Sequence, residues 1–460
     1  MNSAPQKLSL CGWDARYDEL RRLGLREPAY GGTLRRHLEG GRDFQLEHLQ
    51  FDNSPAALRL WNFLLTENSR LHQARARGEK IVGAMKDLGT VPVLACALPG
   101  LRAFYPDGTW WTPCLMAGHD QLLPPARATG IDASFCPVRA LLPAFLNGEQ
   151  FPRPDLLLCS TGAICDDLSA IAQRLEHLGH PILWWEMPRR RPPYPGEKPC
   201  RLPGNLIAPQ LQVDCVRIEL RRIAAALGQL AGRTLNDEIL TAGIQAANQV
   251  RRLLTALRNK VYTAPAAPLP ALEMLLAEML AIHFCSDHEE TIALLGELLT
   301  VAQTRSQRSQ FVIPASAIRV FWVNPVADLR AMNLLEELGG RICGSDFMFT
   351  HTLDLIPEDL PPLEALARTA LADPMAGSTT ERAQRIARDC RANGAEGVII
   401  SRISGASHCA REGGIIREEV QRTIGLPVIE LEIPPEADAM LPALRTQLKE
   451  LFKIARLRRT

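Results

Sequence analysis

Residues 154–188 read PDLLLCSTGAICDDLSAIAQRLEHLGHPILWWEMP. Two short apolar runs, 155–161 and 181–188, flank a segment whose apolar residues recur at helical spacing, and Gly179 is a typical helix stop. A strand, a helix and a second strand follow one another here within about 34 residues. This order predicts a βαβ unit, in which the two strands are parallel.

The same alternation recurs near the end of the chain. Apolar runs with the length of strands lie at 317–325, 341–349, 396–404 and 427–435. Helical patterns separate them at 327–340, 379–394 and 415–425. These segments predict a second parallel sheet with its own crossover helices.

The remaining segments complete the predicted fold. An apolar run at 91–99 is expected to be the first strand of the first sheet, and most of the residues before 80 are expected to be helical. Long helical patterns occupy 210–232, 235–262 and 270–285, after a proline-rich linker or loop at 189–204. We therefore predict an α/β fold with two Rossmann-like parallel-sheet domains, an N-terminal helical segment and an intervening helical section. The predicted limits of these parts are 1–80, 81–208, 209–310 and 311–460.

Composition restricts the possible partners. The 460 residues contain 52 Lys and Arg against 51 Asp and Glu, a net charge of +1. Such a balance provides no long-range attraction to nucleic acid or to anionic membranes. The sequence has no run of 18 apolar residues, and its first residues lack a basic stretch followed by an apolar one. We expect neither a membrane span nor a secretory signal. We therefore expect a cytoplasmic protein.

Twelve cysteines are spread along the chain. In a reducing compartment few of them are expected to form disulfides, and the common role of a free cysteine is that of a small buried side chain. Ligands in parallel α/β domains, however, gather beyond the carboxyl ends of the strands. Cys165 and Cys409 follow predicted strands there, and Cys136 precedes Pro137 at a predicted helix start. Cys343 lies in, or at the edge of, a predicted strand.

Cysteines at helix starts are suited to metal binding. A helix N-terminus carries partial positive charge, which stabilises a thiolate and an anionic cluster. The Gly and Ser residues around Cys409 would let backbone N–H groups approach a cluster sulfur. Structural zinc sites usually contain a close Cys pair, and no pair separated by two to four residues occurs here. Spacing alone leaves open an iron–sulfur cluster and cysteines that only pack.

Several segments together resemble one known family. The iron–sulfur component of the 2-hydroxyacyl-CoA dehydratases, which is related to the ATP-dependent benzoyl-CoA reductases and the double-cubane-cluster proteins, has similar segments in the same order. The similar segments here are FCPVRALLPAF (135–145), residues 154–188, residues 318–347, GVIISRISGASHC (397–409) and LPVIELEIPP (426–435). The first ~90 residues do not match it clearly.

The resemblance implies a metal centre and its ligands. The cluster ligands of the family fall on Cys136, Cys165 and Cys409. Three thiolates would leave one iron of a 4Fe–4S cluster open to substrate or solvent, and the cluster would lie between the two α/β halves. Residues 405–414, GASHCAREGG, would then be a ligand loop.

The sequence also departs from the dehydratase pattern. The family has a Cys after a strand that corresponds to KIVGAMKDLG (80–89), and none is present here. Cys114 and Cys159 are additional cysteines, and SGASHC is more similar to the double-cubane-cluster proteins. Cys114, Cys159 and Cys343 are therefore candidate further ligands of a bridged double-cubane 8Fe–9S cluster, with packing as their alternative role.

Other residues allow both a functional and a structural interpretation. His408 could deliver a proton to a reduced substrate or only satisfy a turn. Arg189, Arg190 and Arg191 could contact coenzyme A phosphates or form a solvated loop. Neither GxxxxGK[ST] nor GxGxxG occurs, and the resemblance implies that a separate ATP-hydrolysing iron–sulfur activator supplies low-potential electrons.

The sequence thus predicts an iron–sulfur reductase subunit that reduces a bound small-molecule or acyl-CoA substrate, with the double-cubane type favoured. One alternative is a 2-hydroxyacyl-CoA dehydratase subunit that performs radical dehydration at a 4Fe–4S cluster. Another is a non-catalytic partner subunit of such an enzyme, in a homodimer or a heterodimer with a related chain. A cluster-free α/β binding protein is the third alternative.

Overall fold

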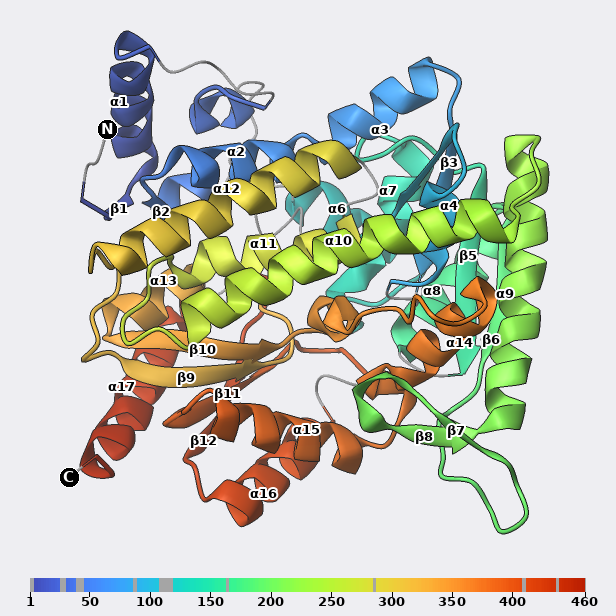
Figure 1. The fold of residues 1–460 in the computed structure, drawn as a ribbon. Helices are drawn as coiled ribbons and strands as arrows, with labels where there is room; N and C mark the ends of the chain where they lie inside the picture. Colours follow the sequence, from blue (N-terminus) through green and yellow to red (C-terminus); the bar gives the residue numbers. More distant parts are fainter. Residues whose placement is uncertain are drawn as a thin grey trace.

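The computed structural model describes residues 4–24, 30–38, 45–85, 89–106, 119–162, 165–283, 287–407, 411–435 and 438–459. Within these ranges the chain contains two four-stranded sheets in which all neighbouring strands are parallel. Helices surround both sheets, as Figure 1 shows. The predicted α/β fold with two parallel sheets is therefore confirmed.

The first sheet has the strand order β4-β3-β5-β6. Its strands are β3 (Lys80–Met85), β4 (Leu101–Phe104), β5 (Leu156–Gly162) and β6 (Ile182–Met187). Helix α8 (Asp166–His177) connects β5 to β6, which confirms the βαβ unit predicted from residues 154–188.

The prediction of a strand at 91–99 is wrong. Residues Val91–Cys96 form helix α4, which has Pro92 in its first turn, where a missing N–H costs nothing. Every residue of Val91–Ala95 is buried, so the apolar run lacks the alternation that distinguishes a strand from a buried helix. The neighbouring strands are instead β3 and β4, on either side of this helix in the sequence.

The second sheet has the strand order β10-β9-β11-β12. Its strands are β9 (Ile318–Val323), β10 (Gly340–Asp346), β11 (Gly397–Arg402) and β12 (Val428–Glu432). Helices α13 (Arg330–Glu337), α15 (Thr379–Ala392) and α16 (Gly413–Ile424) connect them and confirm the three predicted helical patterns. A capping box formed by Ser378 and Glu381 begins α15.

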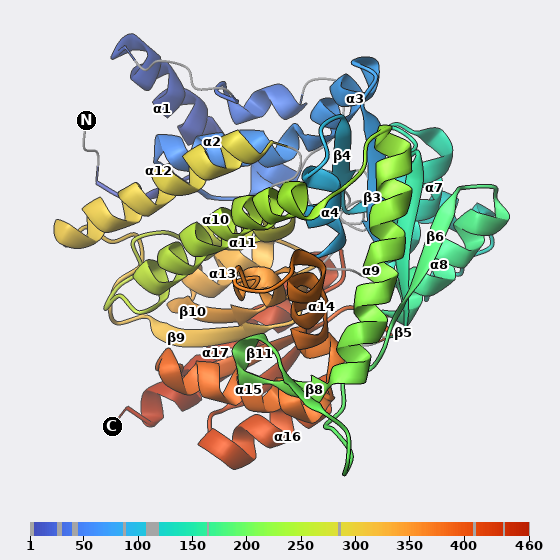
Figure 2. The ribbon, with the colours of Figure 1, turned by 45° about the vertical axis from the view of Figure 1, so that its right-hand side comes forward.

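Long helices join the two sheets. They are α9 (Gln210–Ala231), α10 (Asp237–Tyr262), α11 (Ala271–His283) and α12 (His288–Gln307), of which α12 was not predicted. Figure 2 shows α9 beside the first sheet, while α10 extends across the molecule towards the second. One apolar cluster contains Val82 of the first sheet, Leu254 of α10 and Trp322 of the second sheet. We call the part of the molecule that carries the first sheet the first half and the part that carries the second sheet the second half. The two halves therefore share a continuous core.

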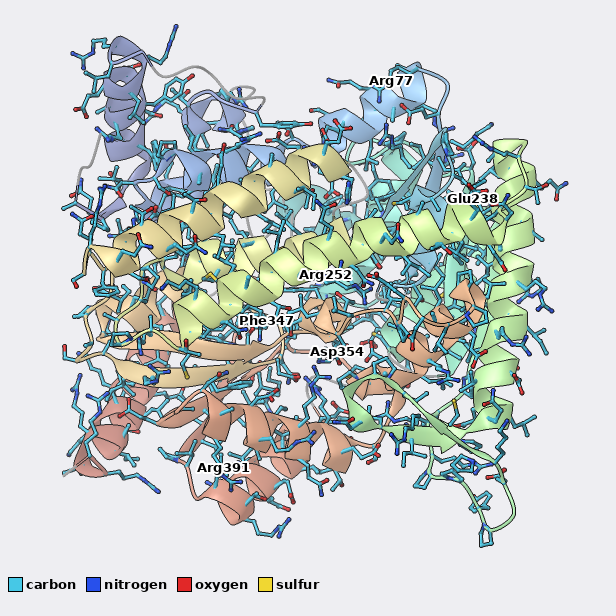
Figure 3. The ribbon with its side chains drawn as sticks, viewed as in Figure 1. Arg77, Glu238, Arg252, Phe347, Asp354 and Arg391 are labelled. Carbon is cyan, nitrogen blue, oxygen red and sulfur yellow. The ribbon has the colours of Figure 1, made fainter. Side chains whose placement is uncertain are left out.

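A buried arginine of α10 also connects the loop after one strand of the first sheet with the segment after one strand of the second sheet. The side chain of Arg251 is enclosed, and it donates hydrogen bonds to the carbonyl oxygens of Gly89 at 2.9 Å and of Asp354 at 2.6 Å. Gly89 follows β3 and Asp354 follows β10 in the sequence. Figure 3 labels Asp354 and Arg252, the neighbour of Arg251 on α10.

The N-terminal residues form helices α1 (Leu10–Arg22), α2 (Pro55–Leu65) and α3 (Glu67–Ala76) and a short ladder between β1 (Lys7–Leu8) and β2 (Phe51–Asp52). Strands β7 (Pro199–Arg201) and β8 (Ile207–Pro209) form an antiparallel ribbon at the end of the proline-rich segment. Helices α6 (His119–Ala128), α14 (Pro362–Ala372) and α17 (Leu441–Leu457) are the other longer elements among the described residues. No helix among the described residues has both the length and the apolar character needed to cross a membrane. The predicted domain limits stay a prediction.

Candidate metal centre

Cys136 lies where the first half of the molecule meets the second. It caps a short 3-10 helix (Pro137–Ala140) that leads into α7 (Leu141–Asn147), so the predicted helix start at Pro137 is confirmed. Its half-buried side chain packs against the apolar cluster of the first half. It also packs against a small cluster formed by Ala327, Ile403 and Ala406 of the second half.

Cys165 occupies the N-cap position of α8, directly beyond β5. It is 6% exposed, and its Sγ lies 4.0 Å from Oδ2 of Asp167. Burial raises the pKa of the Cys136 thiol to about 12, and negative charge on Cys165 and Asp167 acts in the same direction. The two thiols are therefore electrostatic neighbours, and a cation between them would stabilise both thiolates.

The loop after β11 reaches the same place from the second sheet. Gly405 has a φ of +79°, and a Cβ on it would lie 2.1 Å from the carbonyl oxygen of Ser134. Two residues later, the Ser407 N–H donates to Oδ2 of Asp167 at 2.7 Å. The chain is thus attached to the Cys165 helix two residues before Cys409.

Three of the predicted site residues, Cys114, His408 and Cys409, lie outside the described residues. The structure brings together Cys136, Cys165 and the loop that leads to Cys409 in the sequence. Within the described ranges, no three His, Cys, Asp or Glu side chains are grouped so that they could hold a metal ion. The ligand set therefore stays a prediction.

The structure places the other two cysteines in different surroundings. Cys159 lies within β5 and is fully buried in the apolar cluster that also contains Cys165. Cys343 lies within β10 at an irregularity of the ladder, where burial raises its thiol pKa to about 12. The charged residues that act on Cys343 are Arg319, near the start of β9, and Glu396, just before β11. Cys343 is the middle residue of β10, so it does not lie at the carboxyl edge, where the Gly405 loop follows β11.

Sequence reasoning missed Asp167, and it placed Gly405 in the ligand loop without its contact with Ser134. Asp167 is buried in the first turn of α8 and connects two chain segments that are 240 residues apart. The available signal was the pair Asp166 and Asp167 directly after Cys165, because carboxylates favour the first turn of a helix. Ser407, the partner of Asp167 on the other half, has no local signal in the sequence that predicts this contact.

The described residues fit an iron–sulfur cluster in three respects. Thiolates are the usual protein ligands of such clusters. Gly405 permits an approach of backbone to backbone that a side chain would block. The Ser407 hydroxyl oxygen is buried and has no hydrogen-bond partner among the described residues, so an acceptor such as a cluster sulfide would satisfy it.

Two of the three consecutive arginines, Arg190 and Arg191, make contacts within the chain, and Arg189 is exposed. The buried Arg190 donates to the carbonyl oxygens of Leu371 and of Asp373, the latter at 2.9 Å. Arg191 forms an ion pair with Glu197, with distances of 2.5 and 2.6 Å. These contacts favour a structural role for Arg190 and Arg191 over phosphate binding.

The fold and this site define an α/β protein whose two halves bring cysteine thiols and a small-residue loop together at the carboxyl edges of two parallel sheets. The sequence profile of the family described as "2-hydroxyglutaryl-CoA dehydratase, D-component" matches residues 91–452. The chain therefore belongs to this family, and the match leaves out the first 90 residues, which showed no clear resemblance in the sequence. No curated protein matches the chain significantly.

Proposed function

We propose that the chain is the iron–sulfur component of a dehydratase-type enzyme, with Cys136, Cys165 and Cys409 as the cluster ligands. The family match supports a dehydratase-type subunit. The observation that supports the ligand set most is the Asp167 carboxylate, which contacts Cys165 and holds the loop that continues to Cys409. When bound, such a cluster would take up single electrons at low potential and supply them to a substrate.

The residues of this chain would prepare the site in separate ways. Ala327, Ile403 and Ala406 are buried and would limit the access of water to one side of it. The Ser407 hydroxyl would donate a hydrogen bond to a sulfide, which stabilises added negative charge. Asp167 would fix the distance between the Cys165 helix and the Gly405 loop.

We further propose that the electrons come from a separate ATP-hydrolysing iron–sulfur activator and that the substrate is a 2-hydroxyacyl-CoA. The family name supports the substrate class. The absence of both nucleotide-binding loop motifs from the sequence supports a separate ATPase. The word component in the family name also supports a further subunit, which would be a second copy or a related chain.

Iron and sulfide analysis of anaerobically purified protein, together with its EPR spectrum, tests this proposal. A single cluster of the dehydratase type predicts about four irons per chain. A bridged double cubane, with the reductase activity considered above, predicts about eight and needs thiolates beyond the three ligands. Colourless protein without iron or sulfide after anaerobic reconstitution would refute the cluster in either form.

His408 is proposed as the proton donor to the reduced substrate. A positioned general acid contributes roughly 10²–10⁴-fold to the rate, so His408→Gln should slow turnover by that factor and retain the cluster. The measurement is single-turnover product formation from pre-reduced enzyme, because electron delivery then does not limit the rate. An unchanged rate in this assay would leave His408 with a structural role only.

A further inference from the structure

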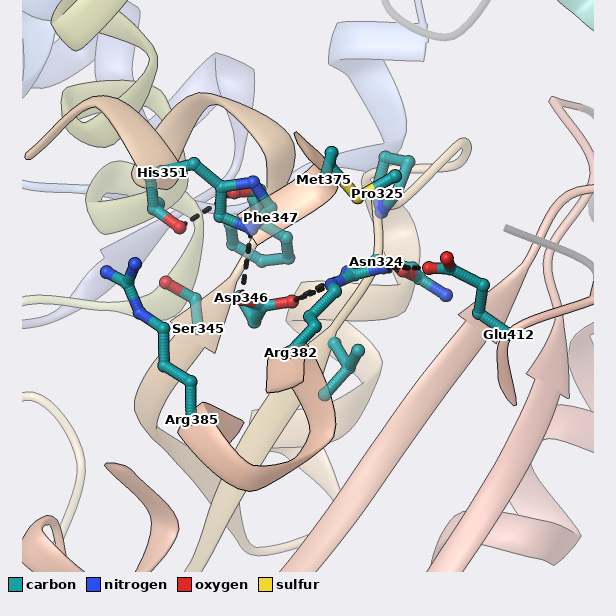
Figure 4. A network of polar contacts seen from close by, with 12 residues as sticks. Asn324, Pro325, Ser345, Asp346, Phe347, His351, Met375, Arg382, Arg385 and Glu412 are labelled. Carbon is teal, nitrogen blue, oxygen red and sulfur yellow. Dashed lines mark hydrogen bonds and ion pairs between the residues drawn. The ribbon is translucent and has the colours of Figure 1, made fainter. Parts of the chain in front are cut away.

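A buried ionic network lies at the carboxyl edge of the second sheet, around Arg382 of α15 (Figure 4). The Arg382 side chain is only 1% exposed. Its Nε and Nη2 donate to Oδ2 of Asp346 at 2.8 and 2.6 Å, and Nη2 also donates to Oδ1 of Asn324 at 2.8 Å. Its Nη1 donates to Oε2 of Glu412 at 2.6 Å.

The three acceptors belong to three different segments of the second half. Asp346 is the last residue of β10, and Asn324 directly follows β9. Glu412 is the N-cap residue of α16 and follows Cys409 by three positions. One guanidinium group therefore connects the ends of two strands to the loop that contains Cys409.

The buried carboxylate of Asp346 holds the Arg382 guanidinium group in place. Nε2 of the fully buried His351 lies 3.0 Å from Oδ1 of Asp346. Burial alone would raise the pKa of Asp346, but the charges of Arg382 and His351 hold it well below its usual range. Asp346 is therefore a permanent anion that orients the guanidinium group.

Glu412 and Ser407 flank Cys409 in the sequence, and each is anchored by hydrogen bonds to another segment. The Glu412 carboxylate binds Arg382 and accepts a second hydrogen bond, 3.0 Å long, from Oγ1 of Thr379. Ser407 binds Asp167 of the other half. Cys409 lies between these two attachments in the sequence, with one residue separating it from Ser407 and two from Glu412.

We infer that Arg382 is a positioning residue for the metal centre and that it acts through Glu412 on the loop of Cys409, an inference that rests on the proposed function. Groups that orient metal ligands change metal affinity and redox potential without touching the metal. Replacing buried charges by apolar residues is often neutral or stabilising. What distinguishes Arg382 from a buried arginine such as Arg305 is its position, because its guanidinium group binds Glu412, the N-cap residue of α16, three residues after Cys409 in the sequence.

The test compares Arg382→Gln and Glu412→Gln with Arg305→Gln. Arg305 is the matched control because it also forms a buried two-point ion pair, with Asp52 at 2.6 and 3.1 Å, and none of its described contacts involves the metal-centre residues. Changes around metal ligands typically weaken metal binding about 10–100-fold. We expect the Arg382 and Glu412 variants to lose iron to a chelator faster by a factor in that range and to shift the midpoint potential. Arg305→Gln should lower stability only.

A second measurement does not require the cluster. In cluster-free protein, Cys409 should react faster with iodoacetamide in Glu412→Gln than in the unmodified chain, because the loop loses one attachment. The exposed Cys11 serves as the internal reference in the same peptide digest. Glu412 is 17% exposed, so this variant remains informative if Arg382→Gln fails to fold.

The outcomes separate this inference from the proposed function. If the unmodified protein holds iron, while both variants match it in iron loss, midpoint potential and Cys409 alkylation, the positioning role is refuted and the cluster assignment stands. If the unmodified protein holds no iron, the proposed function fails, and the inference that rests on it is refuted as well.

Discussion

At the scale of single residues, Asp167 contributes more than a helix-start carboxylate usually does. Its neighbour Asp166 is exposed in the same first turn of α8 and interacts with the same helix dipole. Only Asp167 accepts the Ser407 N–H of the other half. The two acids therefore form a natural pair for separating the local effect from the long-range one.

Asp167→Ala should destabilise the cluster-free protein by about 1.5–3 kcal/mol more than Asp166→Ala, which is the usual range for a hydrogen bond to a charged group. Both variants lose the favourable interaction with the helix dipole, worth about 0.3–1 kcal/mol. Urea unfolding followed by circular dichroism measures the difference. Equal unfolding midpoints for the two variants would show that the Ser407 contact contributes nothing in solution.

Individual positions were predictable only where a local pattern reports them. Cys165 and Cys136 were assigned to helix starts because a strand or a proline adjoins each of them, and the structure confirms both starts. The Asp167–Ser407 contact spans 240 residues and has no local signature in either segment. The partners of Arg382 were missed for the same reason, since Asn324 and Glu412 lie 58 and 30 residues from it.

At the scale of elements, the loop after β11 is shaped by one glycine. Gly405 has a left-handed backbone conformation, and the carbonyl of Ser134 occupies the position of a side chain. Gly414 is a useful comparison, because a Cβ on it would meet nothing within 4 Å. It lies in the first turn of α16, where alanine is favoured over glycine.

Gly405→Ala should destabilise the protein by at least about 1 kcal/mol, the cost of a left-handed conformation for a residue with a Cβ, and displace the loop from Ser134. Gly414→Ala should be neutral or stabilise the helix by up to about 1 kcal/mol. Thermal unfolding and iron retention after reconstitution measure both effects. If Gly405→Ala retains iron as Gly414→Ala does, the close approach at Ser134 is not needed for the metal centre.

Elements with a clear period or clear boundaries were predicted well, and the others were not. The strands of 318–432 and the helices α13, α15 and α16 were recognised because each strand is short and each of these helices is amphipathic, whereas α14 in the same range was missed. The prediction of a strand at 91–99 was wrong because the residues of this run are buried on all sides and show no periodicity. They form helix α4 instead. Helix α12 was missed although Asp287 caps it and acidic residues fill its first turn.

At the scale of the whole molecule, the metal centre depends on how the two halves are held together. They share one apolar core through the long helices, and Arg251 connects the loops after both sheets. The contact of Gly405 with Ser134 and that of Ser407 with Asp167 then join the first and second halves at the thiols. A cluster with ligands from both halves would depend on this arrangement as a whole.

Iron content per chain in three anaerobically purified cysteine variants tests this account most directly. Cys165→Ala removes a ligand of the first half, and Cys409→Ala removes one of the second. Cys390→Ala removes a fully buried cysteine of α15 that packs in a separate apolar cluster, and it is the control. A shared cluster predicts that both ligand variants lose most of their iron while Cys390→Ala keeps the content of the unmodified protein. Full iron content in either Cys165→Ala or Cys409→Ala would contradict a cluster held between the halves.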